Sequence, residues 1–334
     1  MLVAIYRASG IKLILKWVDN FFVIRLPHEI WSEAEFTRLS AQFGVPWSLK
    51  KQHNFASCQC YLGFDWDLEA KTVGFLEDKL QRLRELLKAW LVEGAWFGMA
   101  EAARLHGKLV HASLIFPLIC PFTCLVSFFA ASFLWPGTRL HAPSSLAVDL
   151  TWIRYLIELM PNALPLSVHT PADIGWWGNA STSFGIGIVV GGFWGVWQWA
   201  DGFRVGIKEQ HNIGWAEAVA IELGLAMAHH HTLLDTRPVG SSRILVRSDN
   251  EGVVAVVNKG RSRSCETNLV LKQVFATLAR VRISLATIYV PSANNVADEL
   301  SRGDVHGFLA HFPAARTQSL LALPSHLATY LQSW

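Results

Sequence analysis

The sequence predicts a folded α/β protein. Beyond Leu166 the candidate elements follow in the order strand, strand, strand, helix, strand, helix, helix, strand, helix, which is typical of a sheet covered by helices. Hydrophobic residues make up 51% of the chain and charged residues 16%, and this excludes the composition of a disordered protein. A length of 334 residues allows two or three domains of roughly 100 to 200 residues each.

The first half of the chain is predicted to combine two hairpins with several helices. The polar pair Asp19-Asn20 interrupts an apolar stretch and predicts a tight turn between two strands. Apolar residues at helical spacing predict the helices, and the prolines between Pro161 and Pro165 favour a domain boundary there. The expected elements are strands within 11–26, a helix at 29–43, a hairpin at 60–66 and 72–75, and helices at 77–91, 100–113, 117–133 and 144–160.

The second half is predicted to form the sheet. Its expected strands are 174–180, 184–190, 193–200, 243–248 and 284–290, and its expected helices are 215–230, 250–259, 265–280 and one that begins near Asn295. Several tryptophans alternate along the first and third of these strands, which favours packing on the sheet faces over stacking on nucleic-acid bases.

Net charge and cysteine content restrict the possible cellular compartments and binding partners of the protein. A formal net charge of +3 is too weak a bias to indicate nucleic acid without a local motif. The five cysteines are an odd number and the first residues lack a secretory signal, so we expect an intracellular compartment, cytoplasmic or nuclear. Zinc is not expected, because Cys58 and Cys60 are too close together and a proline lies between Cys120 and Cys124.

One apolar stretch allows two interpretations. Residues 109–138 contain no Asp, Glu, Lys or Arg, and about 20 apolar residues suffice to span a bilayer. His111, Pro117, Pro121, Thr123 and three serines in this stretch are costly in lipid. Buried helices are therefore favoured and no membrane is expected as a partner, while a membrane anchor stays as the alternative.

Three carboxylates lie where an α/β fold builds its sites. Glu217 is in the first turns of the helix after the three strands, Asp249 ends a strand, and Asp298 opens the last helix. Converging carboxylates suit two-metal phosphodiester hydrolysis, because hard cations bind oxygen ligands. Each residue also has an ordinary structural explanation, since acids near a helix N-terminus stabilise its dipole and Asp249-Asn250 suits a helix cap.

Four segments together carry a family resemblance. They are Gly178-Asn-Ala-Ser-Thr182, Trp215-Ala-Glu217-Ala-Val-Ala220, Val246-Arg-Ser-Asp249-Asn250 and Val290-Pro-Ser-Ala-Asn-Asn-Val-Ala-Asp298-Glu-Leu-Ser-Arg302. In order and spacing they resemble the type 1 ribonuclease H domain of retroelement reverse transcriptases. The resemblance implies a ribonuclease H-like mixed sheet with flanking helices, which acts as an endonuclease on RNA in an RNA/DNA hybrid.

The resemblance also implies a metal centre with one defect. In that family four carboxylates bind two Mg²⁺ (or Mn²⁺) ions, and Glu217, Asp249 and Asp298 match three of these catalytic, metal-binding positions. The fourth position is Asn179, an amide that lacks the charge and the second anionic oxygen of an aspartate. We therefore expect a weakened two-ion site and weak or absent hydrolysis.

The N-terminal hairpins resemble the palm of the same polymerases. Lys16-Trp-Val-Asp19-Asn20 matches the hairpin whose two adjacent aspartates bind the polymerase metals, but the second is Asn20 here. Tyr61-Leu-Gly63-Phe64 resembles the primer-gripping hairpin, so Tyr61 and Gly63 are candidates for nucleic-acid binding. The fingers and the earlier palm strand would precede Met1, so polymerase activity is not expected of this chain.

These resemblances predict five domains and a function. The domains are a partial palm at 1–75, a helical thumb at 76–135, a connecting helix at 136–165, the ribonuclease H-like domain at 166–305 and a C-terminal tail at 306–334. The basic loop containing Lys259, Arg261 and Arg263 is a candidate contact for phosphates or an ordinary solvated loop. We expect a retrotransposon-derived fragment, nearest to the tyrosine-recombinase class; the alternative is a non-catalytic nucleic-acid-binding or interaction protein that retains the fold.

Overall fold

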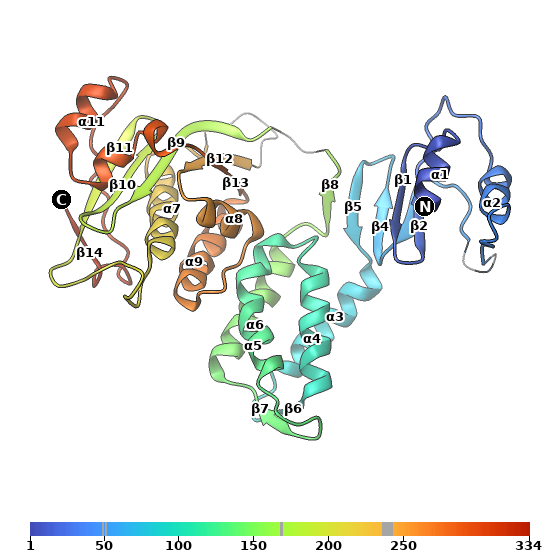
Figure 1. The fold of residues 1–334 in the computed structure, drawn as a ribbon. Helices are drawn as coiled ribbons and strands as arrows, with labels where there is room; N and C mark the ends of the chain where they lie inside the picture. Colours follow the sequence, from blue (N-terminus) through green and yellow to red (C-terminus); the bar gives the residue numbers. More distant parts are fainter. Residues whose placement is uncertain (49, 51, 168–169, 236–242) are drawn as a thin grey trace. The chain divides into compact units, whose positions relative to one another are not determined.

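The computed structural model of the chain, shown in Figure 1, describes residues 1–48, 50, 52–167, 170–235 and 243–334. Contacts between residues divide it into two compact units. Unit 1 comprises Met1–Leu76 and Ala163–Leu166, and unit 2 comprises Glu77–Asn162 and Ser167–Trp334. This division differs from the expected domains, because the helices after Leu76 and the C-terminal sheet belong to one unit.

Unit 1 contains both expected hairpins. Its elements are α1 (Leu2–Ala8), β1 (Ile14–Trp17), β2 (Asn20–Val23), α2 (Glu33–Ala41), β3 (Cys58–Tyr61), β4 (Phe64–Asp67), β5 (Thr72–Phe75) and β8 (Ala163–Pro165). Strands β1 and β2 pair with each other, and the other four form a sheet in the order β3-β4-β5-β8. The first turn falls on Val18-Asp19, one residue earlier than expected, because Asn20 already pairs with Trp17.

The N-terminal helix of unit 1 was not predicted from the sequence. Tyr6 of α1 is fully buried with Ile11 and Ile14. Its ring stacks on Phe36 of α2 with 4.3 Å between ring centroids, and its hydroxyl donates a 2.8 Å hydrogen bond to the Phe36 carbonyl oxygen. This buried aromatic pair holds the two helices against the first hairpin.

Unit 2 begins with the expected helices. They are α3 (Glu77–Trp90), α4 (Met99–Ala112), the 3-10 helix η2 (Pro117–Thr123), α5 (Cys124–Ala131) and α6 (Ser144–Leu159), with a short strand pair β6 (Trp96–Gly98) and β7 (Arg139–His141). The single helix predicted over 117–133 is wrong. Pro121 lies inside the segment, and since proline cannot donate the helical hydrogen bond, the first part is a 3-10 helix. Among the described residues, no helix has the length and apolarity to cross a membrane.

The sheet of unit 2 has six strands in the order β13-β12-β9-β10-β11-β14. The strands are β9 (Ala172–Ala180), β10 (Gly185–Val190), β11 (Phe193–Trp199), β12 (Arg243–Ser248), β13 (Ser284–Tyr289) and β14 (Leu331–Ser333), and the helices are α7 (Ile213–His230), α8 (Glu251–Lys259), α9 (Cys265–Val281), η3 (Ser292–Asn294), α10 (Asp298–Ser301) and α11 (Val305–His311). Strand β12 runs parallel to β9 and β13, while the other pairs are antiparallel. The expected mixed α/β class is confirmed.

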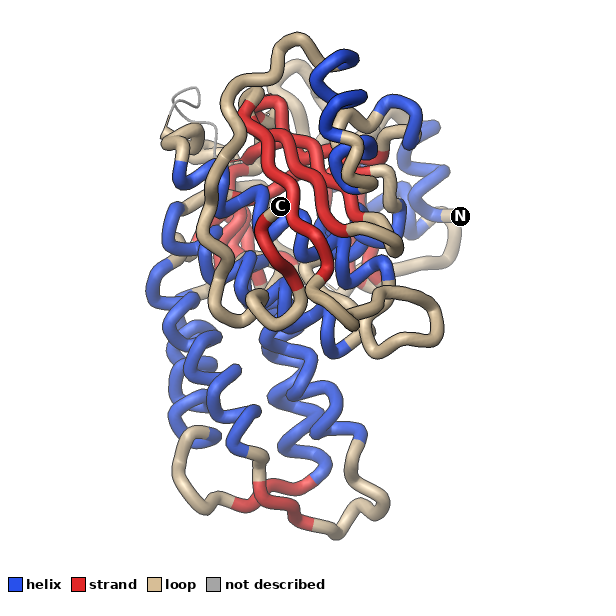
Figure 2. The backbone as a smooth tube through the Cα atoms, turned by 90° about the vertical axis from the view of Figure 1, so that its left-hand side faces the viewer, coloured by secondary structure: helices blue, strands red, loops and turns tan. Residues whose placement is uncertain are grey.

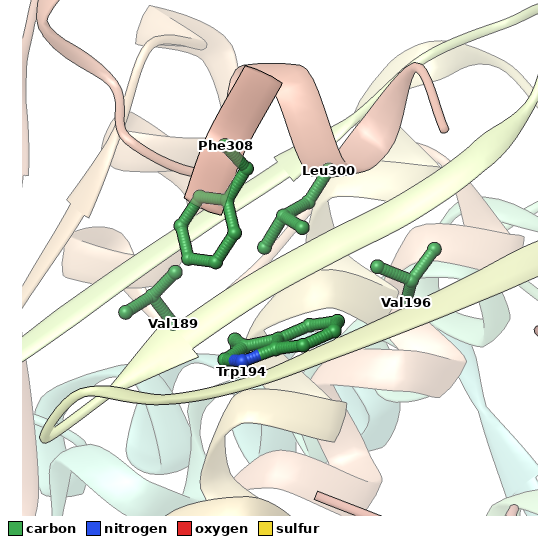
Figure 3. Packing of buried hydrophobic residues seen from close by; sticks show 5 residues of the cluster. All are labelled: Val189, Trp194, Val196, Leu300 and Phe308. Atoms are coloured by element: carbon green, nitrogen blue, oxygen red, sulfur yellow. The ribbon is translucent and has the colours of Figure 1, made fainter. Parts of the chain in front are cut away.

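Helices pack on both faces of this sheet. On one face the cluster in Figure 3 joins Val189 of β10 and Trp194 and Val196 of β11 to Leu300 of α10 and Phe308 of α11. Neighbours on a strand point to opposite faces, so Ile188 points away from this cluster, toward the side where α7 packs against β9 and β10. The five tryptophans predicted to pack on the sheet do so: Trp176, Trp194, Trp197 and Trp199 are buried, and Trp177 is half-buried against the cluster of Figure 3.

The segment expected to be a C-terminal tail completes the edge of the sheet. Strand β14 pairs with β11, and the chain ends one residue later at the point marked C in Figure 2. His326 of the same segment lies 2.9 Å from Glu222 of α7, whose side chain is 10% exposed. Burial raises the pKa of Glu222 to about 8 and lowers the pKa of His326, so this contact is a neutral hydrogen bond at neutral pH.

Buried polar contacts join the N-terminal helices of unit 2 to its sheet. The ammonium group of Lys272 on α9 lies 2.8 Å from both carboxylate oxygens of Asp149 on α6, whose side chain is 5% exposed. The amide of Asn268 donates a 2.6 Å hydrogen bond to the Pro121 carbonyl oxygen of η2. These buried contacts join the helices and the sheet within one compact unit.

Candidate active site

Two parallel strands bring polar residues together at one edge of the sheet. Val246 and Arg247 of β12 pair with Trp176 and Trp177 of β9. Two residues further along each strand lie Asp249 and Asn179, so the parallel register places them side by side. The carboxyl ends of parallel strands are where α/β folds build their sites.

A close helix approach adds Asp298 to this edge. Gly187 of β10 is the cross-strand partner of Asn179, so both face the side on which α10 packs. A Cβ atom on Gly187 would lie 2.5 Å from the Cβ of Leu300 in α10, which no side chain tolerates. The absence of a side chain on Gly187 therefore allows α10 to pack close against the sheet, and this close packing brings Asp298 to Asn179.

Asn179 is the centre of a buried hydrogen-bond network. Its side chain is 4% exposed, and its Nδ2 donates to Oδ1 of Asp298 over 2.7 Å and to the hydroxyl of Ser301 over 3.3 Å. Its Oδ1 accepts a 2.9 Å hydrogen bond from the backbone N–H of Ala180. The amide thus satisfies both of its polar atoms within the protein.

The two aspartates of the site each have a protein donor. Asp298 accepts hydrogen bonds from Arg302, at 2.9 Å from Nε to Oδ2 and 3.1 Å from an Nη to Oδ1. Asp249 accepts a 3.1 Å hydrogen bond from Nδ2 of Asn295, which also donates to the Gly178 carbonyl oxygen. The contacts of Asn295 tie the loop before α10 to the ends of β9 and β12, while the contacts of Arg302 lie within the last turn of α10.

Glu217 reaches the same edge from α7 and is buried beneath it. Its Oε1 accepts a 3.0 Å hydrogen bond from the Ala180 backbone N–H, and its Oε2 accepts a 3.4 Å hydrogen bond from the Ser248 hydroxyl. Burial, followed by the negative charges of Asp249 and Asp298, raises the pKa of Glu217 to about 8. Glu217 is therefore protonated at neutral pH. Because the charges of Asp249 and Asp298 both act on its carboxyl group, the three carboxyl groups lie close together.

The donor atoms of the site differ from those of the two-ion centre that the resemblance implies. Asn179 presents its N–H group, not an oxygen, to Asp298, and its Oδ1 already accepts a hydrogen bond from the Ala180 backbone N–H, whereas a hard cation binds oxygen ligands. Across the residues that the structure describes, no group of three or more His, Cys, Asp or Glu side chains is arranged to hold a metal ion. As arranged here, the residues do not fit a pair of divalent cations.

Asp173 does not compensate for the missing aspartate. It forms an ion pair with Arg247, and this hydrogen-bonded pair lowers the pKa of the Asp173 carboxyl. The guanidinium of Arg247 also lies 4.6 Å from the ring centroid of Trp177. Asp173 is thus engaged at the other end of β9, as its position in the sequence indicates.

The basic loop lies between α8 and α9. Lys259 is the last residue of α8, Gly260 ends the helix with a φ of +73°, and Arg261 and Arg263 follow. Lys259 and Arg263 are exposed and Arg261 is half-buried. Burial of the ring, followed by the positive charge of Arg261, lowers the pKa of His106 on α4, so the loop lies beside the first helices of unit 2.

The candidate polymerase residues lie together in unit 1. Asp19 accepts a 3.2 Å hydrogen bond from the Asn20 amide, and the Asn20 carbonyl oxygen accepts a 3.4 Å hydrogen bond from the Tyr61 hydroxyl. Gly63 has a φ of +84° in the turn that joins β3 to β4. Asp19, Asn20 and Tyr61 line a cavity of about 1340 Å³ that also contains several aromatic side chains. The two hairpins named from the sequence are therefore neighbours.

Sequence reasoning missed three partners of the site, Asn295, Ser301 and Arg302. All three lie in the segment from Val290 to Arg302 that carries the family resemblance, and Arg302 follows Asp298 at a spacing of one helical turn. That spacing is the signal that could have identified the ion pair.

Comparisons with known proteins add no assignment. No protein-family model matches the chain, and no curated protein matches it significantly.

Proposed function

We propose that the chain is a retroelement-derived protein whose sheet domain is ribonuclease H-like and binds an RNA/DNA hybrid at the edge formed by Asn179, Glu217, Asp249 and Asp298. The observation that carries the proposal is the convergence of these residues from four elements, with Asn179 and Asp298 joined at 2.7 Å. The strand order β13-β12-β9-β10-β11, in which β12 runs parallel to both β9 and β13, supports the ribonuclease H-like assignment.

Hydrolysis in this proposal is weak or absent. Cleavage of a phosphodiester needs a group that activates water and positive charge near the developing anion. Here Asn179 is neutral, Glu217 is protonated at neutral pH because burial raises its pKa to about 8, and Asp298 is engaged by Asn179 and Arg302. The residues present can orient a backbone, and of the three carboxylates Asp249, which accepts one hydrogen bond from Asn295 on Oδ1, is the least engaged by the protein.

In unit 1 the proposal assigns a partial palm. The support is the neighbourhood of Asp19, Asn20 and Tyr61, which joins the two hairpins that carry the resemblance. A single acidic residue at the turn does not supply the pair of aspartates that polymerisation needs, so unit 1 is proposed to contact nucleic acid without synthesis.

The alternative is a non-catalytic interaction protein that retains the sheet. The observation that favours it is that protein donors already bind all three carboxylates, because Asp249, Asp298 and Glu217 each accept at least one hydrogen bond from the chain itself. Under this alternative the edge is a stable structural network and not a substrate site.

Cleavage of an end-labelled RNA/DNA hybrid by the full chain tests the proposal. The parent chain, Asn179→Asp and Asp249→Asn are compared with Mg²⁺ and with Mn²⁺. The expected result is binding by all three and cleavage by Asn179→Asp alone. Equal cleavage by the parent chain would show that the amide is tolerated, and failure of the parent chain to bind hybrid would favour the interaction protein.

A further inference from the structure

Arg302 is an exposed cation held over the candidate site. Its side chain is 64% exposed, whereas the Asp298 side chain that it pairs with is 25% exposed. The pKa of Arg302 is raised by its hydrogen bonds to Asp298 and, more weakly, by the charge of Asp249. Arg302 therefore lies near both aspartates, at the solvent side of the network around Asn179.

The guanidinium has donors left for a ligand. It has five N–H groups, and two of its nitrogens donate to Asp298. The planar fork of arginine suits the oxygens of a phosphodiester, and a guanidinium is more easily desolvated than an ammonium group. An exposed arginine with free donors can thus bind a backbone phosphate while it stays paired with Asp298.

The charge of the neighbourhood depends on Arg302. Asn179 contributes no charge, and Arg302 offsets the charge of Asp298 at 2.9 Å. Without Arg302 the two aspartates would repel a phosphate unless another cation were added. Arg302 reduces the combined charge of the two aspartates and the arginine from −2 to −1, and its exposed guanidinium is the cationic group through which a phosphate could bind here.

We infer that Arg302 is the phosphate-binding cation of this edge, so that the chain binds the backbone of an RNA/DNA hybrid without a divalent cation. This inference rests on the proposed function, since it names the group that holds the hybrid at the same edge. The inference gives a role to a residue for which the family resemblance implied none. It also predicts that binding does not require Mg²⁺.

Binding of a fluorescein-labelled RNA/DNA hybrid to the full chain, measured by anisotropy in EDTA, tests the inference. Arg302→Gln is expected to bind about tenfold more weakly than the parent chain, because a hydrogen bond to a charged group is lost. The slope of log K against log salt should decrease by about 0.9, the contribution of one phosphate contact. Arg302→Lys keeps the charge and should retain the salt slope while losing part of the affinity.

Arg82→Gln is the matched control. Arg82 also pairs with an aspartate one turn away on its own helix, and its side chain is 66% exposed, so it reports the effect of losing an exposed ion pair elsewhere. Equal binding by Arg302→Gln and the parent chain would overturn the inference and leave the proposed function intact. Binding by the parent chain only with Mg²⁺ would also overturn it, while no binding by the parent chain under either condition would overturn both.

Discussion

Asn179→Asp tests the hydrogen bond on which the interpretation of the site depends. In the parent chain the Asn179 amide donates to Asp298 over 2.7 Å in a buried position. An aspartate there would bring two carboxylates oxygen to oxygen. At an effective dielectric constant of about 20, two unit charges at that distance repel by about 6 kcal/mol.

Protonation limits this cost. Keeping an ordinary carboxyl, with a pKa near 4, protonated at pH 7 costs about 4 kcal/mol, which is less than the repulsion. The folded variant is therefore expected to hold one proton between the two residues and to lose about 4 kcal/mol of stability at pH 7. Since the folded state then binds a proton that the unfolded chain has released, the loss should grow as the pH rises above about 4 and nearly vanish below it.

Urea unfolding in EDTA, followed by tryptophan fluorescence across this pH range, measures the effect. Asn179→Leu is the control, because it removes the same hydrogen bond without adding a charge and should be destabilised to a similar degree at every pH. The reasoning fails if Asn179→Asp is as stable as the parent chain at pH 7, or if its loss of stability is as independent of pH as that of Asn179→Leu.

Three further predictions concern the rest of unit 2. Lys272→Met should lower the free energy of unfolding, measured with urea, by about 3 to 5 kcal/mol, because the Asp149 carboxylate stays buried without its partner. Adding Asp149→Leu to this variant should restore part of the lost free energy of unfolding. Burial raises the pKa of Glu222 to about 8, as it does for Glu217, so the stability of the parent chain should fall as the pH rises from about 4.5 to 8. In the same unfolding assay Glu222→Gln should reduce that slope by about half, because the contribution of Glu217 remains. Deletion of 316–334 uncovers the edge of β11, and light scattering should detect concentration-dependent association; a monomeric product would contradict this expectation.

The fold could be predicted from the sequence wherever a local pattern decided the element. Strand β12 has the predicted bounds of 243–248, and α3 ends within one residue of its prediction. The elements that were missed depend on distant partners. Strand β14 exists only because β11 offers an open edge, and α1 is fixed by the burial of Tyr6 against α2.

The residues of the site could be named from the sequence, but their contacts could not. The motif segments identified Asn179, Glu217, Asp249 and Asp298, which do meet at one edge. Their hydrogen-bond partners depend on how closely α10 approaches the sheet, and that distance is set by a glycine on another strand, Gly187. A pattern along one segment contains no information about such an approach.

The buried contacts between the helices and the sheet of unit 2 determine whether a fragment or the full chain should be assayed. A fragment that began at Leu166 would remove α6 and η2, leaving the Lys272 ammonium and the Asn268 amide without the partners they bind in the whole unit. A fragment that ended near Gly307 would also remove β14 and expose the edge of β11. Unsatisfied buried groups and an open sheet edge both destabilise a domain, so loss of hybrid binding in such a fragment would report its unfolding. Only the full chain, in which the network around Asn179 keeps its support, separates a defect of chemistry from a defect of folding.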